Sequence, residues 1–201
     1  MTVAVAVTVT VTVAVTVPAR PTDPGGGGYD GGMPTITLAE FNTAPASVIV
    51  PELESILGSA PLADSVAAAR PFRDVADLVA ATSRLLDALS TGEVRDAVNA
   101  HPPIGGSVAR GSRSADEQAG ATESADLDVV RDLQPVYREK FGWNFLIRAA
   151  GRSSGQIRAE LERRMSVGPD EEWVFSVDQL RAINELRLRG YVTDDTDDTD
   201  R

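Results

Sequence analysis

One local pattern recurs along this chain and limits the folds open to it. A Ser or Thr is followed three residues later by Glu or Gln, directly before apolar residues at helical spacing. The hydroxyl accepts a hydrogen bond from a free backbone N–H at the start of a helix, and the Glu or Gln reaches back to the capping residue. The pattern predicts helix starts at Thr37/Glu40, Ser90/Glu93, Ser114/Glu117, Ser153/Gln156 and Ser176/Gln179.

The apolar residues after these starts return every three or four positions, which places them on one face of a helix. They are Val75, Leu78, Val79, Leu85, Leu86 and Leu89, then Ile157, Leu161 and Met165, then Leu180, Ile183, Leu186 and Leu188. The prolines at 51, 71, 102, 135 and 169 are expected mostly between helices or at their starts. Since no alternation of strands and helices appears, we predict an all-α, single-domain bundle of about six to nine helices.

Composition changes at both ends of this helical region. Residues 2–17 alternate Val with Ala and Thr, as in a strand, and residues 18–34 are rich in Pro and Gly, as in a linker. We therefore expect a flexible, low-complexity extension at 1–34, the helical domain at 35–192 and a solvated acidic tail at 193–201. A true start at Met33 is the alternative for the N-terminal end.

The overall charge and the rare residue types exclude several functions. The net charge of −11 and the pI near 4.5 argue against a nucleic-acid-binding surface. With no Cys and one His, the chain has no disulfide, thiolate or multi-histidine metal site, and we expect no metal or cofactor. Residues 2–17 are short for a membrane span and lack the basic start of a signal peptide, so we expect a cytoplasmic protein. A single Lys among many Arg suits either a salty cytoplasm or a GC-rich genome.

Three polar features stand out as candidates for chemistry. His101 follows the predicted helix Glu93–Ala100, whose dipole favours a protonated imidazole and would raise its pKa toward neutrality. On position alone, capping of that helix is the commoner use of such a residue. Ser114/Glu117 forms a capping box or a helix N-terminus that receives an anion, and Gln118 is not needed for the cap. Arg164 lies among apolar residues. It is either a residue in an ion pair or, if it points inward, a residue that binds an anion.

The order and spacing of five motifs resemble the family of 2-oxo-4-hydroxy-4-carboxy-5-ureidoimidazoline (OHCU) decarboxylases. These are H-P-P-I-G at 101–105, S-x-x-E-Q at 114–118, Y-x-x-K-F-G-x-x-F-L-I-R-A-A-G-R-S at 137–153, L-E-R-R-M at 161–165 and I-x-E-L-R-L at 183–188. Two departures are a shorter stretch between the first two motifs and Trp143-Asn144, where the family commonly has Phe-Pro.

The resemblance implies cofactor-free decarboxylation of OHCU to (S)-allantoin and CO2, and a homodimer. It implies His101 and Glu117 as catalytic residues. It implies as substrate-binding residues Pro102, Ser114, Gln118, Phe145, Leu146, Ile147, Arg148, Ala149 and Arg164. The expected partner is the small-molecule substrate, with no nucleic acid and no membrane.

The chemistry of the residues agrees with this reading. The electron pair left by decarboxylation needs an acceptor, and the chain offers one Lys and no ligand cluster, so the C=N bond of the substrate has to accept it. The protein then holds the substrate and delivers a proton, from His101 or from Glu117. The alternatives are a non-catalytic helical interaction module and a decarboxylase of a related ureido heterocycle. The enzyme requires His101, Glu117, Gln118 and Arg164 to converge on one cavity.

Overall fold

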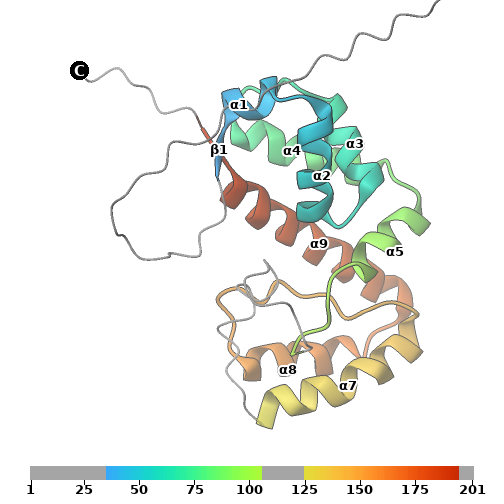
Figure 1. Ribbon diagram of the computed structural model, residues 1–201. Coiled ribbons are helices and arrows are strands. Elements are labelled where there is room, and N and C mark those ends of the chain that lie inside the picture. Colours follow the sequence, from blue (N-terminus) through green and yellow to red (C-terminus); the bar gives the residue numbers. More distant parts are fainter. Residues whose placement is uncertain (1–34, 106–124, 195–201) are drawn as a thin grey trace, which may run out of the picture. The chain divides into compact units, whose positions relative to one another are not determined.

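The computed structural model describes residues 35–105 and 125–194, and in these ranges it confirms the all-α prediction (Figure 1). The described part contains eight helices: α1 (Leu38–Thr43), α2 (Ala46–Leu57), α3 (Ala60–Ala68), α4 (Val75–Asp87), α5 (Thr91–Asn99), α7 (Ala125–Phe141), α8 (Ser154–Arg164) and α9 (Pro169–Tyr191). The predicted extension at 1–34 and residues 195–201 of the predicted tail lie outside the described residues.

A minimal parallel ladder joins the two ends of the described domain. Strand β1 (Ile36–Thr37) pairs with β2 (Val192–Thr193), with Ile36 opposite Val192. Just beyond β2, the Asp194 carboxylate accepts a hydrogen bond of 2.7 Å from the Val75 backbone at the start of α4. The ladder was not predicted, because two residues are too few to show a period in the sequence.

Three of the predicted capping boxes are present, at the starts of α1, α5 and α8. At α5, the Ser90 hydroxyl accepts from the Glu93 N–H at 3.3 Å, and the Glu93 carboxylate accepts from the Ser90 N–H at 2.8 Å. Hydrogen bonds from the Ser90 side chain and backbone hold the pKa of Glu93 below its usual value. The Ser114/Glu117 box lies outside the described residues.

The box predicted at Ser176/Gln179 is wrong. Helix α9 begins at Pro169, after the N-cap Gly168, and carries three acidic residues in its first turn. Proline at the first position and acidic residues beside the positive end of the helix dipole already favour that start. Ser176 therefore lies in the middle of α9, where its buried hydroxyl accepts a hydrogen bond of 2.9 Å from the Trp143 indole.

Two prolines also depart from expectation, because Pro51 lies inside α2 and Pro135 inside α7. Each removes one backbone donor from its helix, and both helices still bury apolar residues on either side of the proline. Pro169 begins α9 and Pro102 follows α5, as the sequence predicted.

Helix α9 connects two groups of helices. Its C-terminal half packs against α2 and α4, while α7 and α8 lie beside each other near its N-terminal half (Figure 1). The buried core runs through both groups and includes Phe41, Leu53, Leu57, Leu78, Ile157 and Leu161. Because α9 reaches both groups, it can bring side chains to the segments that lie between them.

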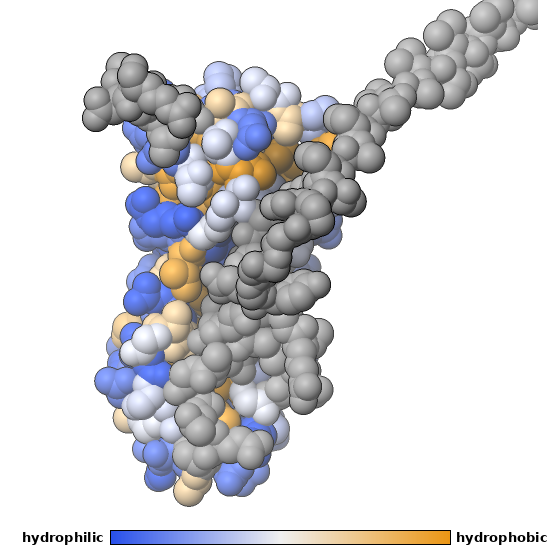
Figure 2. All heavy atoms as spheres, turned by 60° about the vertical axis from the view of Figure 1, so that its left-hand side comes forward, coloured by the Kyte–Doolittle hydropathy of each residue, from blue (hydrophilic) through white to orange (hydrophobic). Residues whose placement is uncertain are grey.

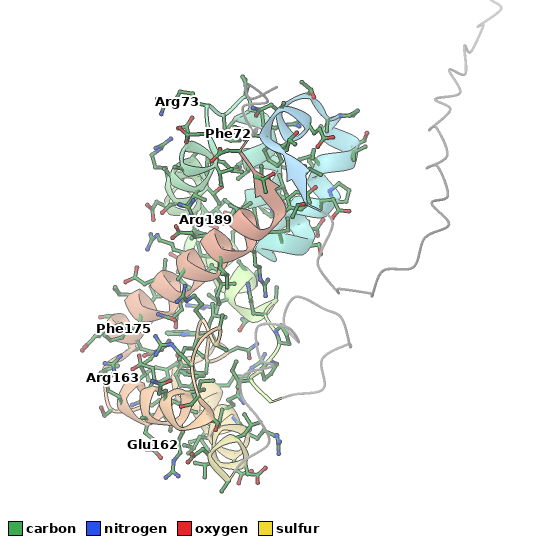
Figure 3. The ribbon with its side chains drawn as sticks, turned by 90° about the vertical axis from the view of Figure 1, so that its left-hand side faces the viewer. Phe72, Arg73, Glu162, Arg163, Phe175 and Arg189 are labelled. Carbon is green, nitrogen blue, oxygen red and sulfur yellow. The ribbon has the colours of Figure 1, made fainter. Side chains whose placement is uncertain are left out.

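The described surface mixes charged and apolar side chains, as one face shows in Figure 2. Arg163 on α8 illustrates this, since it donates two hydrogen bonds to Glu160 and holds the pKa of that carboxyl below its usual value. Its guanidinium carbon also lies 4.5 Å from the centroid of the Phe175 ring on α9 (Figure 3). In the described part of the chain, every helix is too short or too polar to cross a bilayer.

Candidate active site

His101 lies directly after α5 and is buried, with 5% of its surface exposed. Its Nδ1 is 2.8 Å from the Ala97 carbonyl oxygen and its Nε2 is 3.3 Å from Nη1 of Arg187. The imidazole therefore caps the end of α5 through the Ala97 carbonyl, and the same contact fixes the orientation of the ring. Since a carbonyl only accepts hydrogen bonds, the contact with Ala97 suits a proton on Nδ1.

Gly58 leaves room for that imidazole. It ends α2 in the left-handed conformation, with φ at 65°. A Cβ atom at this position would lie 3.2 Å from Cε1 of His101 and 3.3 Å from Cβ of Ala100. The turn and the close approach of His101 both require glycine here.

Arg187 is the site residue that the sequence analysis missed. It lies on α9, is 7% exposed, and donates from Nη1 to the Ile56 carbonyl oxygen at 3.1 Å as well as facing His101. Its position was readable from the sequence, because Leu180, Ile183 and Arg187 follow one another at helical spacing on the buried face of α9. A buried guanidinium beside an imidazole is a suitable receptor for a carboxylate or carbonyl oxygen.

The loop after His101 is tied to α7. The Gln134 side chain accepts from the Ile104 N–H at 2.9 Å and donates to the Ile104 carbonyl at 2.8 Å. Pro102, predicted to bind substrate, is half-buried between His101 and this anchor. A cavity of about 390 Å³ lies next to the loop, lined by Pro103, Ile104, Arg131, Gln134, Pro135, Arg138, Asn144 and Phe145. A larger cavity of about 440 Å³ between α4 and α9 includes none of the predicted site residues.

The segment 144–148, which holds four of the predicted substrate-binding residues, follows Gly142 and is neither helix nor strand. Hydrogen bonds anchor it at every second residue: the Asn144 N–H donates to Asn99 Oδ1 (2.9 Å), the Leu146 carbonyl accepts from Arg164 Nη1 (2.7 Å), and the Arg148 N–H donates to Gln179 Oε1 (3.0 Å). Phe145 and Ile147 are each 3% exposed, and their peptide groups make no hydrogen bond to any described residue. Ala149 is buried and Arg148 is exposed.

Arg164 is fully buried and engaged by protein groups. Its Nε donates to both oxygens of Glu172 at 2.9 and 3.1 Å, and its Nη2 donates to Glu172 and to Ser176. Tyr137 donates to the same carboxylate, and burial raises the pKa of its hydroxyl well above the usual value. Of the two alternatives for Arg164, the geometry favours the ion pair, and none of its contacts in the described residues is with His101.

Ser114, Glu117 and Gln118 lie in 106–124, outside the described residues, so their convergence with His101 stays a prediction. The structure does bring His101 together with Arg187, and it ties the end of α5 to segment 144–148 through Asn99. The rings of Tyr137 and Phe141 pack against each other, with their centroids 4.7 Å apart. Fold and site thus define a class: an all-α protein whose buried imidazole and guanidinium suit proton transfer on a small anion.

Comparison with known proteins gives that class a family. The model of the OHCU decarboxylase family matches residues 42–189, and the chain belongs to this family. It is 27% identical over 161 residues to the 2-oxo-4-hydroxy-4-carboxy-5-ureidoimidazoline decarboxylase of Haloferax volcanii, covering 78% of this chain and 96% of that protein. It is 29% identical over 139 residues to the decarboxylase of the same name from Amia calva, covering 65% of this chain and 79% of that one.

The fold agrees with a solved structure. A crystal structure of OHCU decarboxylase in the presence of (S)-allantoin superimposes with a TM-score of 0.62 at 22% identity, covering 69% of this chain and 94% of that one. Membership of a decarboxylase family favours the enzyme over the alternative of a non-catalytic interaction module.

Proposed function

We propose that this protein removes the carboxylate of OHCU as CO2 and forms (S)-allantoin, a step of urate degradation. The observation that carries the proposal is the buried contact of 3.3 Å between His101 Nε2 and Arg187 Nη1, inside the region matched by the family. An imidazole gives or takes a proton near neutral pH, and a guanidinium binds a carboxylate or carbonyl oxygen. The pair places a proton-transfer group directly beside a receptor for the substrate's anionic side.

In this reaction the protein binds the substrate and transfers protons. Loss of CO2 breaks one carbon–carbon bond. Its electron pair forms a double bond to the neighbouring ring carbon and displaces the C=N pair onto the ring nitrogen, which takes a proton. The ring carbon that bears the ureido group then takes a proton, while the adjacent hydroxyl loses its proton and becomes the carbonyl. Delivery of the proton from one face gives a single enantiomer. We assign these proton transfers to His101 and Glu117.

Segment 144–148 is the proposed binding surface for the ureido group. The buried peptide groups of Phe145 and Ile147 lack partners among the described residues, and such groups are rarely left without a hydrogen bond in folded proteins. A ureido group carries both donors and an acceptor, so it can pair with such groups. Pro102, Ser114, Gln118, Leu146, Arg148 and Ala149 remain proposed substrate contacts on the family resemblance.

A homodimer and a cytoplasmic location complete the proposal. Three large apolar side chains, Val48, Val136 and Val174, are about half exposed in the described residues and are available to a second copy. Light scattering coupled to size exclusion tests the dimer, and cell fractionation tests the location.

The test is product chirality, followed in time from freshly generated OHCU. We expect wild-type protein to give an excess of (S)-allantoin, and His101→Asn to lower the rate by about 100- to 10,000-fold, the usual worth of a positioned proton-transfer group. Arg189→Gln, an exposed change on α9, serves as the control and should leave the rate unchanged. Unchanged stereospecific turnover by a folded His101→Asn variant would remove His101 from the mechanism.

A further inference from the structure

We propose that three side chains, Asn99, Arg164 and Gln179, act together as positioning residues that hold the substrate-binding face of segment 144–148 in place. We call them the clamp. They come from three different helices, α5, α8 and α9, and the side chain of each hydrogen-bonds a backbone group of the segment. The inference rests on the proposed function, because it takes this segment as the surface that binds the substrate.

The three bonds divide the peptide groups of the segment into those that the clamp binds and those that it does not bind. The peptide groups of successive residues in an extended chain point to opposite edges, and the bonds at residues 144, 146 and 148 have the spacing of one such edge. The clamp fills that edge. Phe145 and Ile147 present their peptide groups to the other edge, where the described residues provide no partner. The clamp therefore leaves one edge without a partner among the described residues, and this edge suits a ligand with alternating donors and acceptors, such as a ureide.

Arg164 holds both the backbone and a side chain of the segment. Its Nε and Nη2 bind Glu172, while its Nη1 reaches the Leu146 carbonyl at 2.7 Å. Its guanidinium carbon lies 4.8 Å from the centroid of the Phe145 ring. A buried ion pair often contributes no more to stability than well-packed apolar residues would. We therefore interpret the pair of Arg164 and Glu172 by the positions that it fixes. It fixes the carbonyl of one residue and the ring of the residue before it.

Asn99 connects the segment to the imidazole. It lies two positions before His101 at the end of α5, and it makes two bonds to Asn144: Oδ1 accepts from the backbone N–H at 2.9 Å, and the Asn99 carbonyl accepts from Nδ2 at 3.2 Å. The first bond requires a residue other than proline at 144, because proline has no N–H. The pair thus sets the position of the open edge relative to His101.

Gln179 completes the clamp from α9, the helix that also carries Arg187. Its Oε1 accepts from the Arg148 N–H at 3.0 Å. Arg187 lies about two turns further along the same helix, since it follows Gln179 by eight positions. The same rigid element therefore places the guanidinium beside His101 and one end of the open edge.

The experiment compares Asn99→Ala, Gln179→Ala and Arg164→Lys with wild type in the chirality assay. We expect each to raise KM for OHCU about tenfold and to lower the excess of (S)-allantoin, with kcat changed less than about threefold, because the substrate is held less firmly while His101 is intact. Arg163→Lys, the exposed neighbour of Arg164, is the matched control and should behave as wild type. The pH dependence of kcat should be the same in all of them.

Asn99 and Gln179 are only half-buried, so their alanine variants test the clamp even if Arg164→Lys does not fold. A wild-type KM and product excess in folded Asn99→Ala and Gln179→Ala, with an active wild type, would overturn the clamp and leave the proposed function standing. A wild type that forms allantoin without stereospecific acceleration would instead overturn the proposed function itself.

Discussion

At the scale of single residues, the site depends on how closely atoms approach His101. The ring is held between the Ala97 carbonyl and the Arg187 guanidinium, with Gly58 against its edge. The sequence predicted His101 from its place before a proline, and it contained the signal for Arg187 in the spacing of the buried face of α9. The partners of Arg164 were not predictable, because Glu172 and Leu146 meet it only through packing of α8, α9 and segment 144–148.

Gly58→Ala tests this close approach. We expect it to cost about 1 kcal/mol of stability for the left-handed backbone and, in addition, to lower kcat at least about tenfold, because the new Cβ pushes against Cε1 of His101. Gly142→Ala is the control, since Gly142 also ends a helix with positive φ, but a Cβ atom added there would meet nothing within 4 Å. Urea unfolding and initial rates measure the two effects. Equal losses of kcat in both variants would show that the contact with His101 is irrelevant.

At the scale of helices, the sequence predicted where helices begin better than it predicted which side chains meet between helices. Capping boxes at α1, α5 and α8 were readable because each is built from residues three positions apart. Ser176 and Gln179 matched the same pattern, but tertiary contacts with Trp143 and Arg148 use those side chains inside α9. A local pattern cannot distinguish a helix start from two polar residues on the inner face of a longer helix.

The junction of α7, α8 and α9 gives a prediction for alkaline pH. Burial raises the pKa of Tyr137 in the folded protein, so its contribution to stability is complete below the unfolded value of about 10 and is lost as pH rises above it. Tyr137→Phe removes that titration and should cost about 1 kcal/mol near pH 7 through the lost hydrogen bond to Glu172. Urea unfolding of both proteins should show the difference shrinking above about pH 10. A difference independent of pH would argue against a buried, protonated Tyr137.

At the scale of the molecule, the long helix α9 accounts for the assembly of the site. Its N-terminal half supplies Glu172 and Ser176 to Arg164, and its C-terminal half supplies Arg187 to His101. The all-α class and the family followed from helix patterns and motif order along the chain. The meeting of α5, α8 and α9 around segment 144–148 did not, because it depends on how helices distant in sequence pack.

The sole histidine of the chain allows one direct measurement of the central claim. In protein labelled with 15N, the imidazole nitrogens give one pair of signals, which belongs to His101 without further assignment. Titration with (S)-allantoin should shift the Nε2 signal in a saturable way, and Arg187→Lys should weaken the apparent affinity. Allantoin that binds without moving either imidazole signal would contradict a product site built on His101 and Arg187.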